Sequence, residues 1–276
     1  MDLHDIAPTL IRNPAGYWQD TQTVEELSYP VGGNDFCLEI EDSSFWFAHR
    51  NDVIVAAVRR YPPGGPIFDV GAGNGYVAAA LERAHFPTIA IEPNRAGAAN
   101  AARRGLERVV HGRLPSSAFV EGAAGAIGLF DVVEHIADDA AFLLSLRPYL
   151  KRGGRVYVTT PAFDSLWSQN DTAAGHHRRY TRARLRALLE GAGFAVEYET
   201  YFFAFLPPPL FLFRVLPSRF RRSDAAVRER SRAQHRPASA AVRRAVERLL
   251  APELGRIARG KSIPFGASCL AVARVR

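Results

Sequence analysis

The chain has 276 residues, of which 47% are hydrophobic and 23% are charged, and these proportions are ordinary for a globular protein. The sequence starts without the basic and apolar regions of a signal peptide. Its longest apolar run, residues 201–217, is interrupted by three prolines and is shorter than the roughly 20 residues that cross a bilayer. These features argue against a membrane span and predict a cytoplasmic protein of one large domain or two small ones.

The net charge of +7 is concentrated in one segment. Residues 202–262 contain 13 Arg and one Lys against four acidic residues, a net charge of +10, so the rest of the chain carries −3. The two cysteines, Cys37 and Cys269, lie in apolar stretches, which favours buried thiols in a reducing compartment. No group of Cys and His residues has the spacing of a zinc site, so metal ligands are not predicted.

Helices and strands alternate along the chain after an irregular N-terminal segment, residues 1–42. A helix is predicted from an N-cap at Ser43 or Ser44, with apolar side chains returning on one face until "PPGGP" ends it. Further helices are predicted at residues 75–85, 94–105, 138–150 and 181–193. Short apolar strands are predicted at residues 67–70, 88–92, 108–110, 125–130, 153–161, 194–202 and 267–275.

This alternation predicts an α/β fold with a mostly parallel sheet of seven strands, covered by helices on both faces. The last two strands flank the basic segment and are expected to pair as an antiparallel edge. We therefore assign one domain to residues 43–201 together with 263–276, and we treat residues 202–262 as a helical insertion.

A glycine-rich turn, "GAGNG", follows the first predicted strand. A dinucleotide fingerprint would place its third glycine where Tyr76 stands. Asp69 precedes the turn with a negative charge, which disfavours a pyrophosphate and suits a cationic ligand. Glu92 ends the next strand, where a carboxylate can accept hydrogen bonds from two ribose hydroxyls. This combination fits S-adenosylmethionine, although the glycines would also serve a tight turn and Glu92 a solvated strand end.

The pattern "FDVGAGNGY … IAIEP … FDVVEHIADD … LRPYLKRGGRVYVTTPA" resembles class I S-adenosylmethionine-dependent methyltransferases. The resemblance covers about residues 43–201 and the last strand, and it implies a Rossmann-like, doubly wound fold with S-adenosylmethionine as cofactor. Two further stretches, "SSFWFAHR" and "LWSQNDTAAGHHRRYT", look like a bacterial subgroup linked with glycan and lipid modification.

The resemblance implies a set of cofactor-binding positions. "HGRLP" matches the adenine-side loop, although Arg113 stands where the family often has an acid, so only backbone contacts carry over. Arg50 would reach the methionine carboxylate, unless it pairs with an acid on its own helix. The implied cofactor residues are Arg50, Asp69, Gly71, Ala72, Gly73, Gly75, Glu92, Pro93, Gly112, Arg113, Leu114, Phe130 and Asp131.

The loop over residues 166–181 is dense in polar and aromatic groups, which suggests a binding surface rather than a solvated loop. We predict that it contacts the substrate through Trp167, Asp171, Arg178 and Tyr180. If the acceptor is a hydroxyl, a base assists, and we assign that role to His176 and, second, to His135. An amine or carboxylate acceptor needs no base, and the alternative for Glu134 and His135 is to brace the following helix.

These observations predict methyl transfer to a small-molecule, lipid-linked or glycan acceptor, at a hydroxyl oxygen. The apolar start and arginine-rich remainder of residues 202–262 resemble a peripheral membrane-surface element, with a lid or an oligomer interface as alternatives. An RNA methyltransferase that uses this basic segment is a second hypothesis, although the aromatic cluster away from the arginines disfavours nucleic acid. A non-catalytic cofactor-binding assembly partner is a third.

Overall fold

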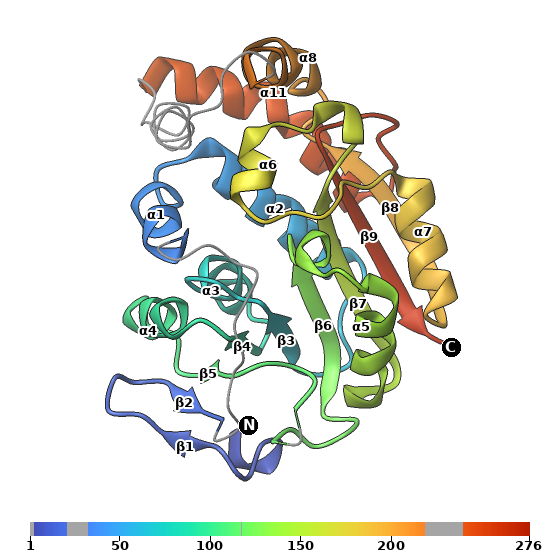
Figure 1. Cartoon of the computed structure of the whole chain (residues 1–276). Helices are drawn as coiled ribbons and strands as arrows, with labels where there is room; N and C mark the ends of the chain where they lie inside the picture. Colours follow the sequence, from blue (N-terminus) through green and yellow to red (C-terminus); the bar gives the residue numbers. More distant parts are fainter. Residues whose placement is uncertain (1–2, 21–32, 117, 219–239) are drawn as a thin grey trace.

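The computed structural model describes residues 3–20, 33–116, 118–218 and 240–276 (Figure 1). Within these ranges the strands are β1 (Ile11–Arg12), β2 (Trp18–Gln19), β3 (Ile67–Val70), β4 (Thr88–Glu92), β5 (Val109–His111), β6 (Ala124–Phe130), β7 (Leu150–Pro161), β8 (Phe194–Phe202) and β9 (Ser268–Val275). They form one sheet in the order β1-β2-β5-β4-β3-β6-β7-β9-β8. All seven strands predicted from the sequence are present.

The centre of the sheet is parallel, and this places three polar strand ends together. β3 pairs in parallel with both β4 and β6, so Asp69 is in register with Ala90 on one side and with Gly128 on the other. The strand order reverses direction across β3 and β6, which is where ligands bind in open parallel sheets. Asp69, Glu92 and Asp131 therefore lie at the same carboxyl edge.

The two edges of the sheet differ from the sequence prediction. The last two strands do pair antiparallel, but β9 lies between β7 and β8, antiparallel to both, so that β8 forms the edge. At the other edge, β1 and β2 come from the segment predicted to be irregular, and Trp18 pairs in parallel with Val110. Strands of two residues carry no alternation, which is why the sequence pattern did not reveal them.

Helices cover both faces of the sheet (Figure 1). On one face α2 (Phe45–Arg60) and α3 (Tyr76–Arg83) pack over Ile67, Tyr157 and Leu270, while α4 (Arg95–Arg103) covers the β4–β5 end. On the other face α5 (Asp139–Leu146) and α7 (Arg182–Gly191) pack over Phe68, Ile127 and Val158. The N-caps are Ser44, one of the two predicted candidates, for α2, Asp138 for α5 and Thr181 for α7, and the side chain of each accepts a backbone N–H of the first turn.

The N-terminal segment also contains a helix that the sequence analysis did not predict. This helix, α1 (Gly33–Ile40), packs against α4. The side-chain amide of Asn74, in the glycine turn, donates to the carbonyl of Asn34 at 2.8 Å, and both residues are buried. The contact fixes α1 beside the carboxyl edge of the sheet, so the segment takes part in the site described below.

The insertion before β9 is helical where it is described. It contains α8 (Pro207–Leu210), a π turn (Phe211–Val215), α9 (Leu216–Ser218) and α11 (Ala240–Ala258). Glu253 of α11 is buried, lies 3.0 Å from the His49 ring of α2 and accepts the backbone N–H of Phe203 at 2.8 Å. These contacts anchor α11 to the domain. Most of the predicted arginine-rich surface, residues 219–239, lies outside the described residues.

Among the described helices, none combines the length and the apolar character required to cross a bilayer.

Candidate active site

The glycine turn after β3 opens onto a cavity of about 670 Å³, which is within the usual range for small-molecule sites. Gly73 has a φ of +56°, and a Cβ at this position would point into open space. Gly75 has a φ of +74°, and a Cβ there would lie 2.8 Å from the Cβ of Ala101 on α4. The two glycines therefore serve different purposes, because Gly75 permits helix packing and Gly73 keeps backbone exposed to the cavity.

Two carboxyl groups stand beside the turn. Asp69 is 2% exposed, and its Oδ2 has no hydrogen-bond partner within the described part of the chain. Burial raises the pKa of Asp69 to about 7, although the charge of Arg50 opposes the shift. Glu92 accepts the backbone N–H groups of Gly73 and Asn94, each at 2.7 Å. Burial also raises the pKa of Glu92 to about 7, so both carboxyl groups titrate near neutral pH.

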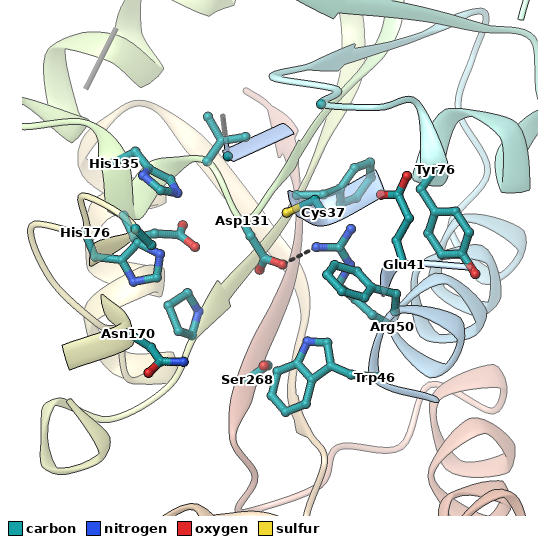
Figure 2. A pocket seen from close by; sticks show the side chains of 18 of the residues that line it. Cys37, Glu41, Trp46, Arg50, Tyr76, Asp131, His135, Asn170, His176 and Ser268 are labelled. Carbon is teal, nitrogen blue, oxygen red and sulfur yellow. Dashed lines mark hydrogen bonds and ion pairs between the residues drawn. The ribbon is translucent and has the colours of Figure 1, made fainter. Parts of the chain in front are cut away.

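A partly buried ion pair lies in the cavity. Arg50 comes from α2, and its Nη1 donates to Oδ2 of Asp131, the first residue after β6. Asp131 also accepts the hydroxyl of Thr159 at 3.0 Å. Arg50 thus pairs across the fold and not with an acid on its own helix, and its buried Nε has no partner among the described residues. Figure 2 shows this pair between the two sides of the cavity.

Two histidines, His135 and His176, lie on the other side of Asp131 from Arg50 (Figure 2), and the carboxyl group of Glu134 lies close to both. The short 3₁₀ turn Val133–His135 presents Glu134 and His135, and His176 follows α6 (Gln169–Ala173). The rings of His135 and His176 are in edge-to-face contact, 4.7 Å apart. Burial, with the nearby His176, lowers the pKa of His135 to about 4, so this imidazole is neutral at pH 7. The backbone N–H of His177 donates to the carbonyl of Glu134 at 2.8 Å, which joins the two segments.

Asp171 holds His176 in place. Oδ1 of Asp171 lies 3.0 Å from Nδ1 of His176 and accepts Nε of Arg179 at 2.8 Å, while Oδ2 accepts Nη2 of Arg179 at 3.0 Å. Burial alone would raise the pKa of Asp171, but the hydrogen bond from His176 and the charge of Arg179 outweigh it and hold the pKa well below its usual range. The carboxylate therefore stays ionised and orients the ring of His176.

Most of the sequence-predicted site residues line this single cavity. Those that do are Arg50, Asp69, Gly71, Ala72, Gly73, Glu92, Pro93, Phe130, Asp131, His135, Asp171 and His176. The predicted adenine-side loop does not: Gly112 and Leu114 are buried away from the cavity and Arg113 is exposed. Gly75 also lies outside the lining, for the packing reason given above.

Three predicted substrate contacts point elsewhere. Arg178 donates through Nη1 to Oδ2 of Asp139 at 2.6 Å, and the hydroxyl of the buried Tyr180 donates to the same oxygen at 2.6 Å. Trp167 donates to the hydroxyl of Thr172 at 3.3 Å, and its ring lies edge-to-face to the His176 ring with 6.5 Å between the ring centroids. Because Asp139 binds both Arg178 and Tyr180, these two side chains fasten the loop to α5 and do not reach the cavity.

The cavity also contains residues that the sequence analysis did not assign to it. They come from α1 and the residue after it, from the aromatic run at the start of α2, from the 3₁₀ turn, from the loop after α6 and from the insertion: Asn34, Cys37, Glu41, Trp46, Phe47, Glu134, Arg179, Leu210, Phe213 and Arg214. The aromatic run before Arg50 was the available signal, but such residues more often form a core. Trp46 does both, since it lines the cavity and stacks on Phe203 at 4.1 Å.

Comparison with known proteins agrees with this geometry. Residues 46–199 match the family described as a methyltransferase domain. A protein of Mycolicibacterium smegmatis, named as a probable S-adenosylmethionine-dependent methyltransferase, is 28% identical over 171 residues, which are 61% of this chain and 66% of that protein. The ubiquinone biosynthesis O-methyltransferase of Caulobacter vibrioides is 29% identical over 100 residues, or 34% of this chain and 40% of that protein.

The fold itself is shared with solved structures. An S-adenosylmethionine-dependent methyltransferase from Thermotoga maritima aligns with a TM-score of 0.56 and 15% identity, covering 89% of this chain and 96% of that one. At this identity the likeness shows the fold alone, whereas the family match spans more than half of the chain. Together with the glycine turn and its two carboxyl groups, these matches show that the chain belongs to the class I S-adenosylmethionine-dependent methyltransferases.

Proposed function

We propose that this protein transfers a methyl group from S-adenosylmethionine to a hydroxyl oxygen of an amphipathic acceptor. The observation that carries this proposal is the division of one cavity by the Arg50–Asp131 pair. By strand order, the glycine turn, Asp69 and Glu92 lie on the β3–β4 side of Asp131, and His135 and His176 lie on its other side (Figure 2). A cofactor and an acceptor can therefore meet at Asp131 from opposite sides.

The residues around the glycine turn fit the cofactor. Asp69 Oδ2 and Arg50 Nε are buried polar atoms that have no hydrogen-bond partner among the described residues. Oδ2 can accept a hydrogen bond from the ammonium group of the cofactor's amino-acid part, and Nε can donate one to its carboxylate. Glu92 is held by two backbone N–H groups and retains lone pairs for sugar hydroxyls. When bound, S-adenosylmethionine supplies an electrophilic methyl group on a positively charged sulfur. The chain's part is to hold donor and acceptor in line, which contributes about 7–11 kcal/mol in favourable cases.

Binding of S-adenosylhomocysteine is expected to weaken by at least about tenfold between pH 8 and pH 6, of which Glu92 accounts for about tenfold and Asp69 for any further loss. The pKa of Glu92 is about 7, so the carboxylate that accepts sugar hydroxyls is mostly ionised at the higher pH and mostly protonated at the lower one. Affinity therefore rises with pH and levels off once Glu92 is ionised. Calorimetric titration at several pH values measures the slope.

The matched variant is Glu92→Gln, which has no charge to lose. It should bind weakly at both pH values and keep only the dependence that comes from Asp69, whose pKa is also about 7. A pH slope equal to that of the wild type would assign the titration to another group.

The acceptor side favours a hydroxyl. Asp171 occupies Nδ1 of His176, so Nε2 is the atom that faces an acceptor. An oxygen acceptor must lose a proton as it gains the methyl group, and activation of this kind contributes about 10²–10⁴-fold. The similarity to the Caulobacter O-methyltransferase, whose name specifies an oxygen acceptor, also supports this choice.

The rim of the cavity favours an amphipathic acceptor. Leu210 and Phe213 line the cavity, and Phe213 is 69% exposed. Phe211 and Leu212 beside it are exposed as well, so the apolar lining continues onto the surface of the insertion. A hydroxyl carried on an apolar chain or ring, such as a lipid-linked acceptor, could enter along this path, and the same surface would suit contact with a membrane.

The proposal is tested by methyl transfer from radiolabelled S-adenosylmethionine into fractionated cell extracts. We expect the label in the organic phase, in a product that resists mild base as an ether does and an ester does not. His176→Ala should lower turnover by about 10²–10⁴-fold while the dissociation constant of S-adenosylhomocysteine changes little. His177→Ala is the matched control, because His177 is exposed and does not line the cavity. Label found in RNA, or equal losses in both variants, would contradict the proposal.

A further inference from the structure

Three groups that commonly bind metals converge where the acceptor is proposed to lie. One donor atom from each of Glu134, His135 and His176 lies within 4.8 Å of the other two. Glu134 is 0% exposed, and neither of its carboxylate oxygens has a hydrogen-bond partner among the residues that the structure describes. A buried carboxyl group with no donor is costly. We infer that Glu134, His135 and His176 bind a divalent first-row metal ion.

The surroundings of His176 match those of a metal ligand. Metal-binding histidines almost always give their second ring N–H to a carboxylate or carbonyl, which fixes the tautomer and turns the other nitrogen toward the metal. Asp171 does this for Nδ1 of His176 at 3.0 Å. Arg179 in turn binds Asp171 through two hydrogen bonds, so the carboxylate carries a compensating charge and is itself held still.

The donor set indicates the kind of ion. Two imidazole nitrogens and one carboxylate oxygen suit Mn²⁺, Co²⁺ or Zn²⁺ better than Mg²⁺ or Ca²⁺, which prefer oxygen alone. In tetrahedral coordination, ligand bonds of 2.0–2.2 Å place two donor atoms about 3.3–3.6 Å apart. The three donor atoms, which lie within 4.8 Å of one another, would therefore move closer by up to about 1.5 Å on binding, through rotation of the side chains. Three protein ligands leave coordination positions open toward the cavity.

This inference rests on the proposed function and specifies how the acceptor is activated. A cation at these three groups would lower the pKa of an acceptor hydroxyl that coordinates it. The hydroxyl proton would then pass to solvent, and the oxygen lone pair would form the new bond to the methyl carbon. The bond between sulfur and the methyl carbon would break with its electron pair going to sulfur, which leaves S-adenosylhomocysteine. With the ion bound, Nε2 of His176 acts on the acceptor through the metal, as its ligand, in place of the direct base role that the sequence predicts; loss of His176 lowers turnover in either case. A protonated Glu134, braced in the core, is the competing explanation for its burial.

Metal binding can be measured without turnover. Co²⁺ titrated into chelator-treated protein should give visible absorption bands that saturate at one ion per chain. Glu134→Gln keeps the size of the side chain and removes its charge, and it should weaken Co²⁺ binding by at least about tenfold, as should His135→Ala. His177→Ala, which alters an exposed histidine next to His176, should bind Co²⁺ as the wild type does. S-adenosylhomocysteine binding by each variant checks that it is folded.

The outcomes separate this inference from the proposed function. Absence of Co²⁺ binding by protein that still binds S-adenosylhomocysteine would overturn the metal site and leave the methyltransferase proposal standing. Undiminished Co²⁺ binding by Glu134→Gln would also overturn the metal site. Glutamine resembles a protonated glutamate and supplies no carboxylate, so unchanged binding would mean that the Glu134 carboxylate is not a ligand. Failure of the wild type to bind S-adenosylhomocysteine would instead count against the proposed function, whatever the cobalt result.

Discussion

Replacing Gly73 with Arg is expected to abolish detectable binding of S-adenosylhomocysteine. A Cβ at Gly73 meets nothing within 4 Å, so the new side chain would extend into the space that the ligand needs. The backbone N–H of Gly73 also orients Glu92 at 2.7 Å, and a shift of the turn would disturb that carboxylate. Calorimetric titration should show a loss of at least a hundredfold in affinity, and methyl transfer should fall with it.

Backbone strain is the competing cause, and the chain offers a matched control for it. Gly105 has a φ of +91°, is exposed, and likewise has open space where a Cβ would point, but it lies outside the cavity. Gly105→Arg therefore imposes a comparable left-handed backbone cost of about 1–2 kcal/mol without filling the site. Normal binding by Gly105→Arg and none by Gly73→Arg would assign the loss to the cavity. Equal losses in both variants would assign it to strain.

The cofactor side of the site could be predicted because each of its signals is local. The apolar run of β3 ends at Val70, the glycines follow at once, and Glu92 closes the next predicted strand. Parallel pairing of β3 with β4 and β6 then brings these strand ends together without further information. For the same reason Asp131, at the end of β6, could be placed beside the turn from the sequence alone.

The acceptor side could be predicted only in part, because it depends on which way loop side chains turn. Residues 166–181 are rich in functional groups, and the sequence alone does not say which of them face the cavity. His176 and Asp171 do, while Arg178 and Tyr180 turn to Asp139 on α5. That contact joins residues about forty positions apart along the chain and has no sequence signature.

Two other contributions were hidden for different physical reasons. α1 lies in a stretch with scattered Pro, Gly and Asn, and it is held beside the site by a tertiary contact, the hydrogen bond from Asn74 to the Asn34 carbonyl. Glu134 follows β6 in a turn, where a carboxyl group ordinarily reaches solvent or caps a helix. Its complete burial is visible only in the folded chain.

Asp171→Asn is expected to lower the free energy of unfolding by about 3–5 kcal/mol at pH 7, or Tm by at least about 6 °C. The substitution keeps the size of the side chain but leaves the guanidinium of Arg179, which is 6% exposed, without its carboxylate. The carbonyl of Ala162, 3.0 Å from Nη1, would remain as a partner of that buried charge. Denaturant unfolding followed by circular dichroism measures the difference.

The pH dependence of this effect has a definite sign. The pKa of Asp171 in the folded protein is held below that of an ordinary aspartate. The ionised carboxylate is therefore more stable in the folded state than in the unfolded state, and its ionisation stabilises the fold. The stabilisation is complete above about pH 4 and is lost as the pH falls toward the folded-state pKa, so wild type and Asp171→Asn should converge in acid.

Asp164→Asn is the matched control: Asp164 accepts the backbone N–H of Arg179 at 3.1 Å, but its side chain is 69% exposed. Asp164→Asn should lower the free energy of unfolding by less than about 1 kcal/mol, because an exposed charge near Arg179 stabilises the fold little. In Asp171→Asn, by contrast, the buried charge of Arg179 loses the carboxylate that compensates it.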